Sequence, residues 1–247
     1  MRANLKKLSL YSLFLILALP ALADTEEIVF PPTKIEAVAY VVYDIKSNKM
    51  ILEHNAEAQL PLASITKLMT IYEAYSESLG DDRTACYTLV SSSNEEADRI
   101  SRSTHGGIAG MNLIAKDLGL RQTFYLNASG LDITDTISGA YGSALDQAIL
   151  MTKIYNEYPS VMHCTTEKLA TLGSITKTNT NTSIDRIIGI AGSKTGFTDL
   201  AGGNLAIIFD AGIEEPVVII VLGSSQEGRF LDAERLSLFA INYLSSQ

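Results

Sequence analysis

Tryptophan is absent from the sequence, and cysteine and histidine are rare. The three histidines, His54, His105 and His163, are scattered, and the chain contains neither an H-E-x-x-H nor a C-x-x-C motif. Zinc and other transition metals usually need ligands at such close spacing. We therefore expect no metal site and no cofactor.

Positive charge is also scarce, with 19 Lys+Arg against 28 Asp+Glu over the whole chain. Three of the positive residues lie within residues 1–23, so the remainder carries a net charge of about −12. Nucleic acid phosphates repel such a chain, and it contains no basic block. We expect no nucleic-acid partner.

Long apolar runs are missing except near the N-terminus. A positive start is followed by the nearly continuous apolar run Leu8 to Leu19 and by the small-x-small sequence Ala21-Leu22-Ala23. The run is short for a membrane span and is typical of an export signal, with an uncleaved anchor as the alternative. We predict a signal peptide over residues 1–23 and one domain over residues 24–247. The expected location is the periplasm or the outer face of the cell envelope.

The only two cysteines are Cys86 and Cys164. In an exported protein they could form one disulfide, and two buried free thiols are the other possibility. The sequence says nothing of the distance between them, so both possibilities stay open.

Hydrophobic patterning places strands near both ends of the domain and helices between them. It predicts hairpins from residues 36–44 with 50–54 and from 203–210 with 216–223. It predicts helices from Ser64 to before Gly80, and at 108–118, 143–158 and 230–244, with helix-forming residues at 95–99. Residues 123–131 are expected to form a loop, and a hairpin or broad loop is expected where 169–175 and 184–190 bracket a polar segment. This order is typical of an α/β protein of the α+β type: an antiparallel sheet with packed helices, a helical lobe, and a site in the cleft between them.

Two Ser-x-x-Lys motifs occur, Ser64 to Lys67 and Ser174 to Lys177. The first continues into a helical pattern, where residues three apart share a face, so the lysine can accept the serine proton. For this, the lysine pKa must lie below its usual value near 10.4, which burial and a second cation such as Lys194 can achieve. The second motif runs into Thr and Asn, so Ser174 is expected to be structural.

Three motifs follow one another in the order Ser64-x-x-Lys67, Ser92-Ser93-Asn94 and Lys194-Thr195-Gly196. This order resembles the pattern of penicillin-binding proteins and serine β-lactamases. The sequence around the motifs is similar to that of the D-alanyl-D-alanine carboxypeptidase family of low-molecular-mass penicillin-binding proteins, the S11-like peptidases. The resemblance extends over roughly residues 36 to 240 and implies a β-lactamase/transpeptidase-like fold. The similar segments are 62–70, 90–94, 111–131 and 192–202.

The resemblance implies a serine-type carboxypeptidase that removes terminal D-alanine from peptidoglycan stem peptides through an acyl-serine. β-Lactam antibiotics would be its covalent inhibitors. Ser64 would be the nucleophile, Lys67 its base, and Ser92 a proton relay to the leaving D-alanine. Asn94 would hold the substrate amide or Lys67.

The resemblance further implies that Lys194 and Thr195 bind the terminal carboxylate and that Gly196 admits the substrate as an added strand. Backbone N–H groups of Ser64 and Phe197 would stabilise the oxyanion. Arg229 would either help to bind a carboxylate or be an ordinary surface residue.

Two departures from the family keep alternatives open. Ser64 and Ser92 are only 28 positions apart, whereas family members usually have a longer segment there. Many members also add a β-rich domain and an amphipathic membrane anchor after the closing helix, and we expect no stable membrane anchor here. The alternatives are a D,D-endopeptidase that cleaves cross-links, a β-lactamase, and a non-catalytic peptidoglycan-binding module. The β-lactamase is disfavoured because it needs a base that activates water for deacylation, and no Glu-x-x-x-Asn segment lies between Asn94 and Lys194. A nucleophile-elbow hydrolase is disfavoured because Gly-x-Ser-x-Gly does not occur.

Overall fold

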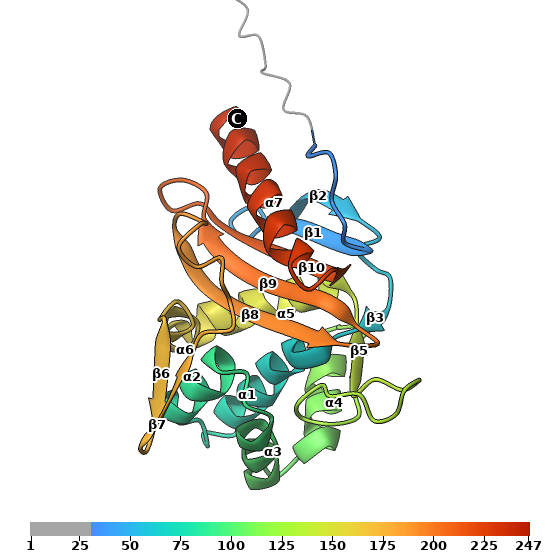
Figure 1. The fold of residues 1–247 in the computed structure, drawn as a ribbon, viewed down its shortest axis with the longest axis vertical. Helices are drawn as coiled ribbons and strands as arrows, with labels where there is room; N and C mark the ends of the chain where they lie inside the picture. The colour runs from blue at the N-terminus through green and yellow to red at the C-terminus, as the bar shows by residue number, and fades with distance from the viewer. Residues whose placement is uncertain (1–30) are drawn as a thin grey trace, which may run out of the picture.

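The computed structural model describes residues 31–247, so the predicted signal peptide over residues 1–23 lies outside the described residues. A five-stranded antiparallel sheet runs through the molecule (Figure 1). Its order is β2-β1-β10-β9-β8, so the first strand of the domain, β1, pairs with its last strand, β10. The strands are β1 (Ala39–Asp44), β2 (Lys49–His54), β8 (Ile190–Thr198), β9 (Gly202–Asp210) and β10 (Pro216–Ser224).

Both faces of this sheet are buried, which explains the nearly continuous apolar sequence of its central strands. Along β9, Leu205, Ile207 and Phe209 belong to one hydrophobic cluster, whereas Ala206 and Ile208 belong to the other. Successive side chains of a strand point to opposite faces, so one strand contributes to both cores. On one face α7 (Gly228–Ser245) packs against β9 and β10, and on the other α5 (Ala144–Glu157) packs against β1 and β10.

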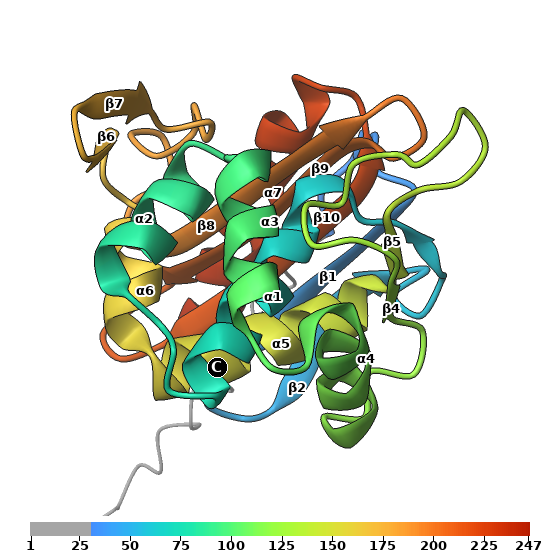
Figure 2. The ribbon, with the colours of Figure 1, turned by 90° about the horizontal axis from the view of Figure 1, so that it is seen from below.

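The middle of the chain forms a helical lobe on the α5 side of the sheet (Figure 2). Side chains cap two of its helices, because Asp81 accepts from the Thr84 N–H and Ser93 accepts from the Glu96 N–H. The lobe consists of the 3₁₀ turn η1 (Ala63–Thr66) and of α1 (Lys67–Ser76), α2 (Asp82–Val90), α3 (Asn94–Ser103), α4 (Gly107–Asp117) and α6 (Pro159–Cys164).

Two small sheets complete the fold. One has the order β3-β5-β4, and the other is the hairpin of β6 and β7. Their strands are β3 (Leu60–Pro61), β4 (Phe124–Tyr125), β5 (Ala140–Gly142), β6 (Leu169–Leu172) and β7 (Ile175–Thr178).

The predicted fold class, both predicted hairpins of the large sheet and the three helices α4, α5 and α7 are confirmed. The loop expected over residues 123–131 also contains the two-residue strand β4. Among residues 31–247, none of the helices combines the length and the apolarity that crossing a membrane requires.

A hairpin and a loop do occur within residues 169–190, but their positions differ from the prediction. The hairpin closes at Gly173, whose φ of 60° suits a tight turn, so residues 176–178 of the threonine-rich run lie in β7 and residues 179–189 form the loop. Residues 184–190 therefore do not supply the partner strand, and only Ile190 begins a strand, β8.

Three helical details also differ from the prediction. Residues 63–66 form a 3₁₀ turn before α1, so the α-helix itself begins at Lys67. The helix α2 was not predicted as a separate element. Pro159 ends α5 as expected, but it also starts α6, since a proline at the first turn loses no backbone hydrogen bond.

Candidate active site

The serine and lysine of the first motif meet at the junction of η1 and α1. Lys67 is fully buried, and its Nζ lies 2.7 Å from Oγ of the half-buried Ser64. The preceding residue, Ala63, has a φ of 48°, in the left-handed region that residues other than glycine rarely adopt. Such a conformation persists where tertiary contacts enforce it. The surrounding fold therefore holds Ser64 on a strained turn.

Two acceptors determine the direction of the Lys67 amine. Nζ donates to Asn94 Oδ1 at 2.7 Å and to the Ser129 carbonyl at 2.8 Å. A neutral amine has two N–H groups and one lone pair, and these two oxygens accept both N–H groups. The lone pair then points to Ser64, whose hydroxyl can donate to it. A general base needs this arrangement.

The amine is also easily neutralised. Burial lowers the pKa of Lys67 to about 7, and the nearby charge of Asp98 acts in the opposite direction. Near neutral pH a large fraction of the side chain is therefore uncharged, in line with the expectation from the motif. The charge of Lys194, expected to contribute, is not among the causes of the lowered Lys67 pKa. The effect runs the other way, because the charge of Lys67 helps to lower the pKa of Lys194.

Lys194 reaches from β8 to the helical lobe. Its Nζ donates to Ser92 Oγ at 2.9 Å and to the Thr195 carbonyl at 2.7 Å. Burial, followed by the charges of Lys67 and Arg229, holds the pKa of Lys194 well below its usual value. Ser92 lies in the short connection between α2 and α3. The three motifs thus meet where the lobe touches the sheet.

The third motif lies on the outermost strand of the large sheet, and Gly196 brings that strand against the nucleophile turn. A Cβ at Gly196 would lie 3.1 Å from the Ser64 amide nitrogen and 3.0 Å from the Leu62 carbonyl oxygen. Contacts this short are tight for a real side chain, so only glycine lets β8 lie so close to Ser64. Phe197, the next residue, is 43% exposed. The predicted oxyanion role of the Ser64 and Phe197 amides stays a prediction.

Arg229 is buried, so the view of it as an ordinary surface residue was wrong. It lies in the first turn of α7 and donates from Nη1 to the Gly196 carbonyl at 2.6 Å. Its guanidinium carbon is also 4.7 Å from the centre of the Phe230 ring. The arginine thus supports β8 directly beside the nucleophile turn.

Two further groups near the motifs were not found in the sequence. The carbonyl of Ser129 binds Lys67, and the hydroxyl of Thr180 lies 2.6 Å from that of the buried Thr195. Every residue has a backbone carbonyl, so the residue type of Ser129 does not indicate that its carbonyl binds Lys67. Thr180 lies within a threonine-rich run in which nothing distinguishes it from its neighbours. Neither could have been identified from spacing.

The remaining candidates lie away from this site. Ser174 and Lys177 are exposed on the β6–β7 hairpin, so the second Ser-x-x-Lys motif lies in a turn and a strand, as expected, and not on a helix. Within the described residues, no group of three or more His, Cys, Asp or Glu side chains could hold a metal ion.

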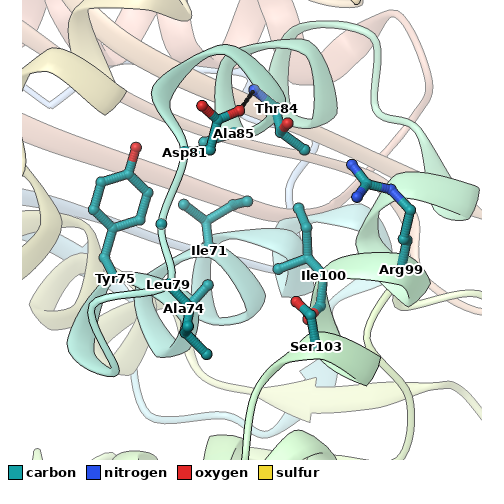
Figure 3. Close-up of a pocket in the computed structure, with 11 residues that line it drawn as sticks. Ile71, Ala74, Tyr75, Leu79, Asp81, Thr84, Ala85, Arg99, Ile100 and Ser103 are labelled. Carbon is teal, nitrogen blue, oxygen red and sulfur yellow. Dashed lines mark hydrogen bonds between the residues drawn. The ribbon is translucent and has the colours of Figure 1, made fainter.

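A separate cavity of about 80 Å³ lies in the lobe between α1, α2 and α3 (Figure 3). It is bordered by residues 79–85, within the shortened segment that connects Ser64 to Ser92. None of the motif residues lines it, so it is distinct from the candidate active site. Its walls include apolar Ile71, Ala74, Leu79 and Ile100 and polar Asp81 and Arg99.

Comparison with known proteins agrees with the motif pattern. The family model described as D-alanyl-D-alanine carboxypeptidase matches residues 25–96 and 86–226. The matched segments overlap at residues 86–96, around Ser92, where the segment after the nucleophile is short.

Three individual proteins illustrate the similarity. D-alanyl-D-alanine carboxypeptidase DacA of Escherichia coli is 25% identical over 256 residues, covering 86% of this chain and 62% of DacA. The chain therefore spans less than two thirds of that relative. The D-alanyl-D-alanine endopeptidase of E. coli is 26% identical, with 93% of this chain and 87% of the endopeptidase covered. Cefotaxime-bound penicillin-binding protein D2 from Listeria monocytogenes superposes with a TM-score of 0.77 at 28% identity, covering 85% of this chain and 99% of that chain.

Proposed function

We propose that this chain, which belongs to the D-alanyl-D-alanine carboxypeptidase family, removes the terminal D-alanine of peptidoglycan stem peptides through an acyl-serine intermediate. The observation that carries the proposal is the environment of Lys67. Two acceptors, Asn94 and Ser129, bind its N–H groups, and its remaining contact is Ser64 Oγ at 2.7 Å.

Acylation begins with proton transfer from Ser64 to Lys67. The hydroxyl oxygen attacks the carbonyl carbon of the D-alanyl-D-alanine bond, and the amine takes the hydroxyl proton. Base assistance of this kind contributes roughly 10²- to 10⁴-fold to a rate. The amides of Ser64 and Phe197 are the donors that we expect to stabilise the oxyanion, and one such donor is worth about 3 kcal/mol.

Departure of D-alanine requires a proton on its nitrogen. Ser92 is suited to deliver it, because its Oγ lies 2.9 Å from Lys194 Nζ, which can replace the proton. Lys194 and Thr195 offer a cation and a hydroxyl to the terminal carboxylate of the substrate. Water then hydrolyses the acyl-serine and releases the shortened peptide.

The same chemistry would let β-lactams acylate Ser64. Support comes from penicillin-binding protein D2 of L. monocytogenes, which has been crystallised in cefotaxime-bound and ampicillin-bound forms. A β-lactam mimics the cleaved bond but acylates without losing a leaving group, so it should remain attached for longer than the peptide.

A second candidate activity is cleavage of D-alanyl cross-links. The matched length favours it, because the match covers 87% of the E. coli D-alanyl-D-alanine endopeptidase but only 62% of the carboxypeptidase DacA. Both reactions use one acyl-serine and differ in the leaving group, which is free D-alanine in one and a cross-linked stem peptide in the other.

We further propose that the protein is exported and works on the cell envelope. The positively charged start, the apolar run and the small-x-small sequence within residues 1–23 support this. Identification of the N-terminal residue of protein recovered from the envelope tests it, with cleavage after Ala23 as the expected result.

The activity is tested by incubating the purified chain with a labelled penicillin, a pentapeptide stem and a cross-linked dimer. We expect a covalent adduct on Ser64 and release of D-alanine from the pentapeptide. Ser64→Ala should abolish both, and Lys67→Ala should slow both at least about 100-fold. Cleavage of the dimer alone would favour the endopeptidase, and rapid turnover of penicillin would favour a β-lactamase. A folded protein that neither forms an adduct nor releases product would be a binding module, and the proposal would be wrong.

A further inference from the structure

The two cysteines belong to helices that pack against each other. Cys86 lies in α2 and Cys164 is the last residue of α6. Cys86 Sγ lies 3.7 Å from the Cys164 carbonyl oxygen, and Cys164 Sγ donates to the Val161 carbonyl at 3.3 Å, so both thiols lie where α2 packs against α6. Both are free in the structure, and both are partly exposed.

Each cysteine is close in the chain to one half of the candidate active site. Ser92 follows Cys86 by six positions and lies in the connection just after α2. Thr165 follows Cys164, and its hydroxyl accepts a hydrogen bond of 2.7 Å from the Ser193 N–H, immediately before Lys194.

The helix α6 is also packed tightly on β8 next to that hydrogen bond. A Cβ at Gly192 would lie 3.1 Å from Met162 Cβ. A movement of α6 is therefore transmitted to β8, and a movement of α2 is transmitted to the Ser92 turn. The two helices in contact are therefore each joined directly to one partner of the Ser92–Lys194 hydrogen bond.

We propose that Cys86 and Cys164 form an intramolecular disulfide that joins α2 to α6 and thereby holds Ser92 beside Lys194. The expected export supports this, because disulfides persist outside the cytoplasm. The bond would close a long loop of the chain, which is the situation in which a disulfide constrains the unfolded state most.

The chemistry is a thiol–disulfide exchange with a small disulfide such as oxidised glutathione as the oxidant. The Cys86 thiolate attacks one glutathione sulfur and releases one glutathione thiolate. The Cys164 thiolate then attacks Cys86 Sγ and releases the second one. The two cysteine protons end on the two glutathione molecules, so the protein loses two electrons and glutathione disulfide gains them.

The thiols are suited to this order of events. The hydrogen bond from the neighbouring thiol lowers the pKa of Cys86, so Cys86 becomes the thiolate more readily and attacks first. The same hydrogen bond, together with burial, raises the pKa of Cys164, so Cys164 stays protonated while Cys86 attacks and forms its thiolate only for the second step.

The test uses the full chain, purified without reductant and then treated with oxidised glutathione. We expect a monomer without maleimide-reactive thiols whose mass is lower than that of the reduced protein by two hydrogen atoms. Single variants Cys86→Ser and Cys164→Ser should instead retain one bound glutathione. Two reactive thiols, stable mixed disulfides or disulfide-linked dimers of the unaltered chain would overturn the proposal.

Two further measurements test the consequence of the bond. Reduction should lower the Tm of the unaltered chain by about 10 °C and leave the double variant Cys86→Ser/Cys164→Ser unchanged. Reduction should also slow penicillin acylation several-fold, because Ser92 and Lys194 are held less firmly. An unchanged Tm or an unchanged acylation rate would contradict the structural role. The thiol count and the Tm need no substrate, so they remain decisive even if the proposed peptidase activity is wrong.

Discussion

Ser92 Oγ lies 2.9 Å from Lys194 Nζ, although 102 positions separate the two residues in the chain. One residue belongs to the helical lobe and the other to the outermost strand of the sheet. This hydrogen bond marks the point where the lobe and the sheet meet, and the nucleophile turn lies next to it. Two of the predictions that follow concern the charge and the space around that point, and the third concerns a buried carboxyl of α1.

The pH dependence of acylation should move in opposite directions in two variants next to Lys67. The acylation rate should rise with pH as Lys67 loses its proton. In Asn94→Asp a carboxylate replaces the amide oxygen 2.7 Å from Nζ and favours the ammonium form, so this rise in rate shifts to higher pH. In Asp98→Asn the attraction that raises the Lys67 pKa is lost, so the rise in acylation rate shifts to lower pH. Penicillin acylation rates measured across pH check this, with a midpoint near 7 for the unaltered chain. Shifts of the same sign in both variants would show that Lys67 is not the group that titrates.

Gly196→Ala should impair acylation far more than stability. The new Cβ would press on the Ser64 amide and the Leu62 carbonyl, and a displacement of the nucleophile by about 1 Å can cost roughly 100-fold in rate. Gly212→Ala is a matched control, because its Cβ would have only ordinary contacts with Glu215 in an external turn. Acylation rates and Tm values of the two variants are compared. Equal rates for both variants would mean that the close approach of β8 to Ser64 has no role in the reaction.

Glu73 should make the protein less stable as the pH rises. It is fully buried, neither of its carboxylate oxygens has a hydrogen-bond partner among residues 31–247, and Gly110 of α4 lies against it. Burial, followed by the charge of Glu77, raises the pKa of Glu73 from 4.5 to about 7. Because the folded pKa lies above the unfolded one, the contribution to stability is complete below about pH 4.5 and is lost as the pH rises through about 7.

Glu73→Gln keeps the shape of the side chain and removes its titration. The variant should gain on the order of 2 kcal/mol over the unaltered chain at about pH 8 and little at about pH 5. Glu95→Gln, at an exposed position of α3, is the control and should not alter the pH profile. Denaturant unfolding at several pH values measures the difference. A gain that is the same at every pH would assign the effect of Glu73→Gln to packing.

Much of the fold could be predicted because its signals are local. The nearly continuous apolar and β-branched runs of β1, β9 and β10 and the helical spacing of α4, α5 and α7 are present in short stretches of chain. The β6–β7 hairpin was misplaced because its turn depends on Gly173, whereas the polar threonine run suggested a loop. β-Branched threonines form strands readily when a partner strand is present, and no local pattern reveals that partner.

The order of the three motifs likewise indicated Ser64, Lys67, Ser92 and Lys194 as candidate site residues, because the resemblance to the family can be recognised in the sequence alone. It could not give the direction of the Lys67 lone pair, which depends on Asn94 and on a carbonyl 62 positions away. Residue types therefore indicate which chemistry is available. They do not show which groups hold the reacting atoms in place.

The sequence by itself determined the family, the layered α/β class and the set of reactive side chains, because these depend on residue type and on short-range periodicity. Only the tertiary structure decided that Arg229 is buried behind Gly196, that the Glu73 carboxylate has no hydrogen-bond partner within residues 31–247, and that Cys86 and Cys164 lie at one helix contact. Burial and proximity result from packing between distant segments, and the pKa of a lysine or a carboxyl depends on the water and the charges that this packing removes or brings near.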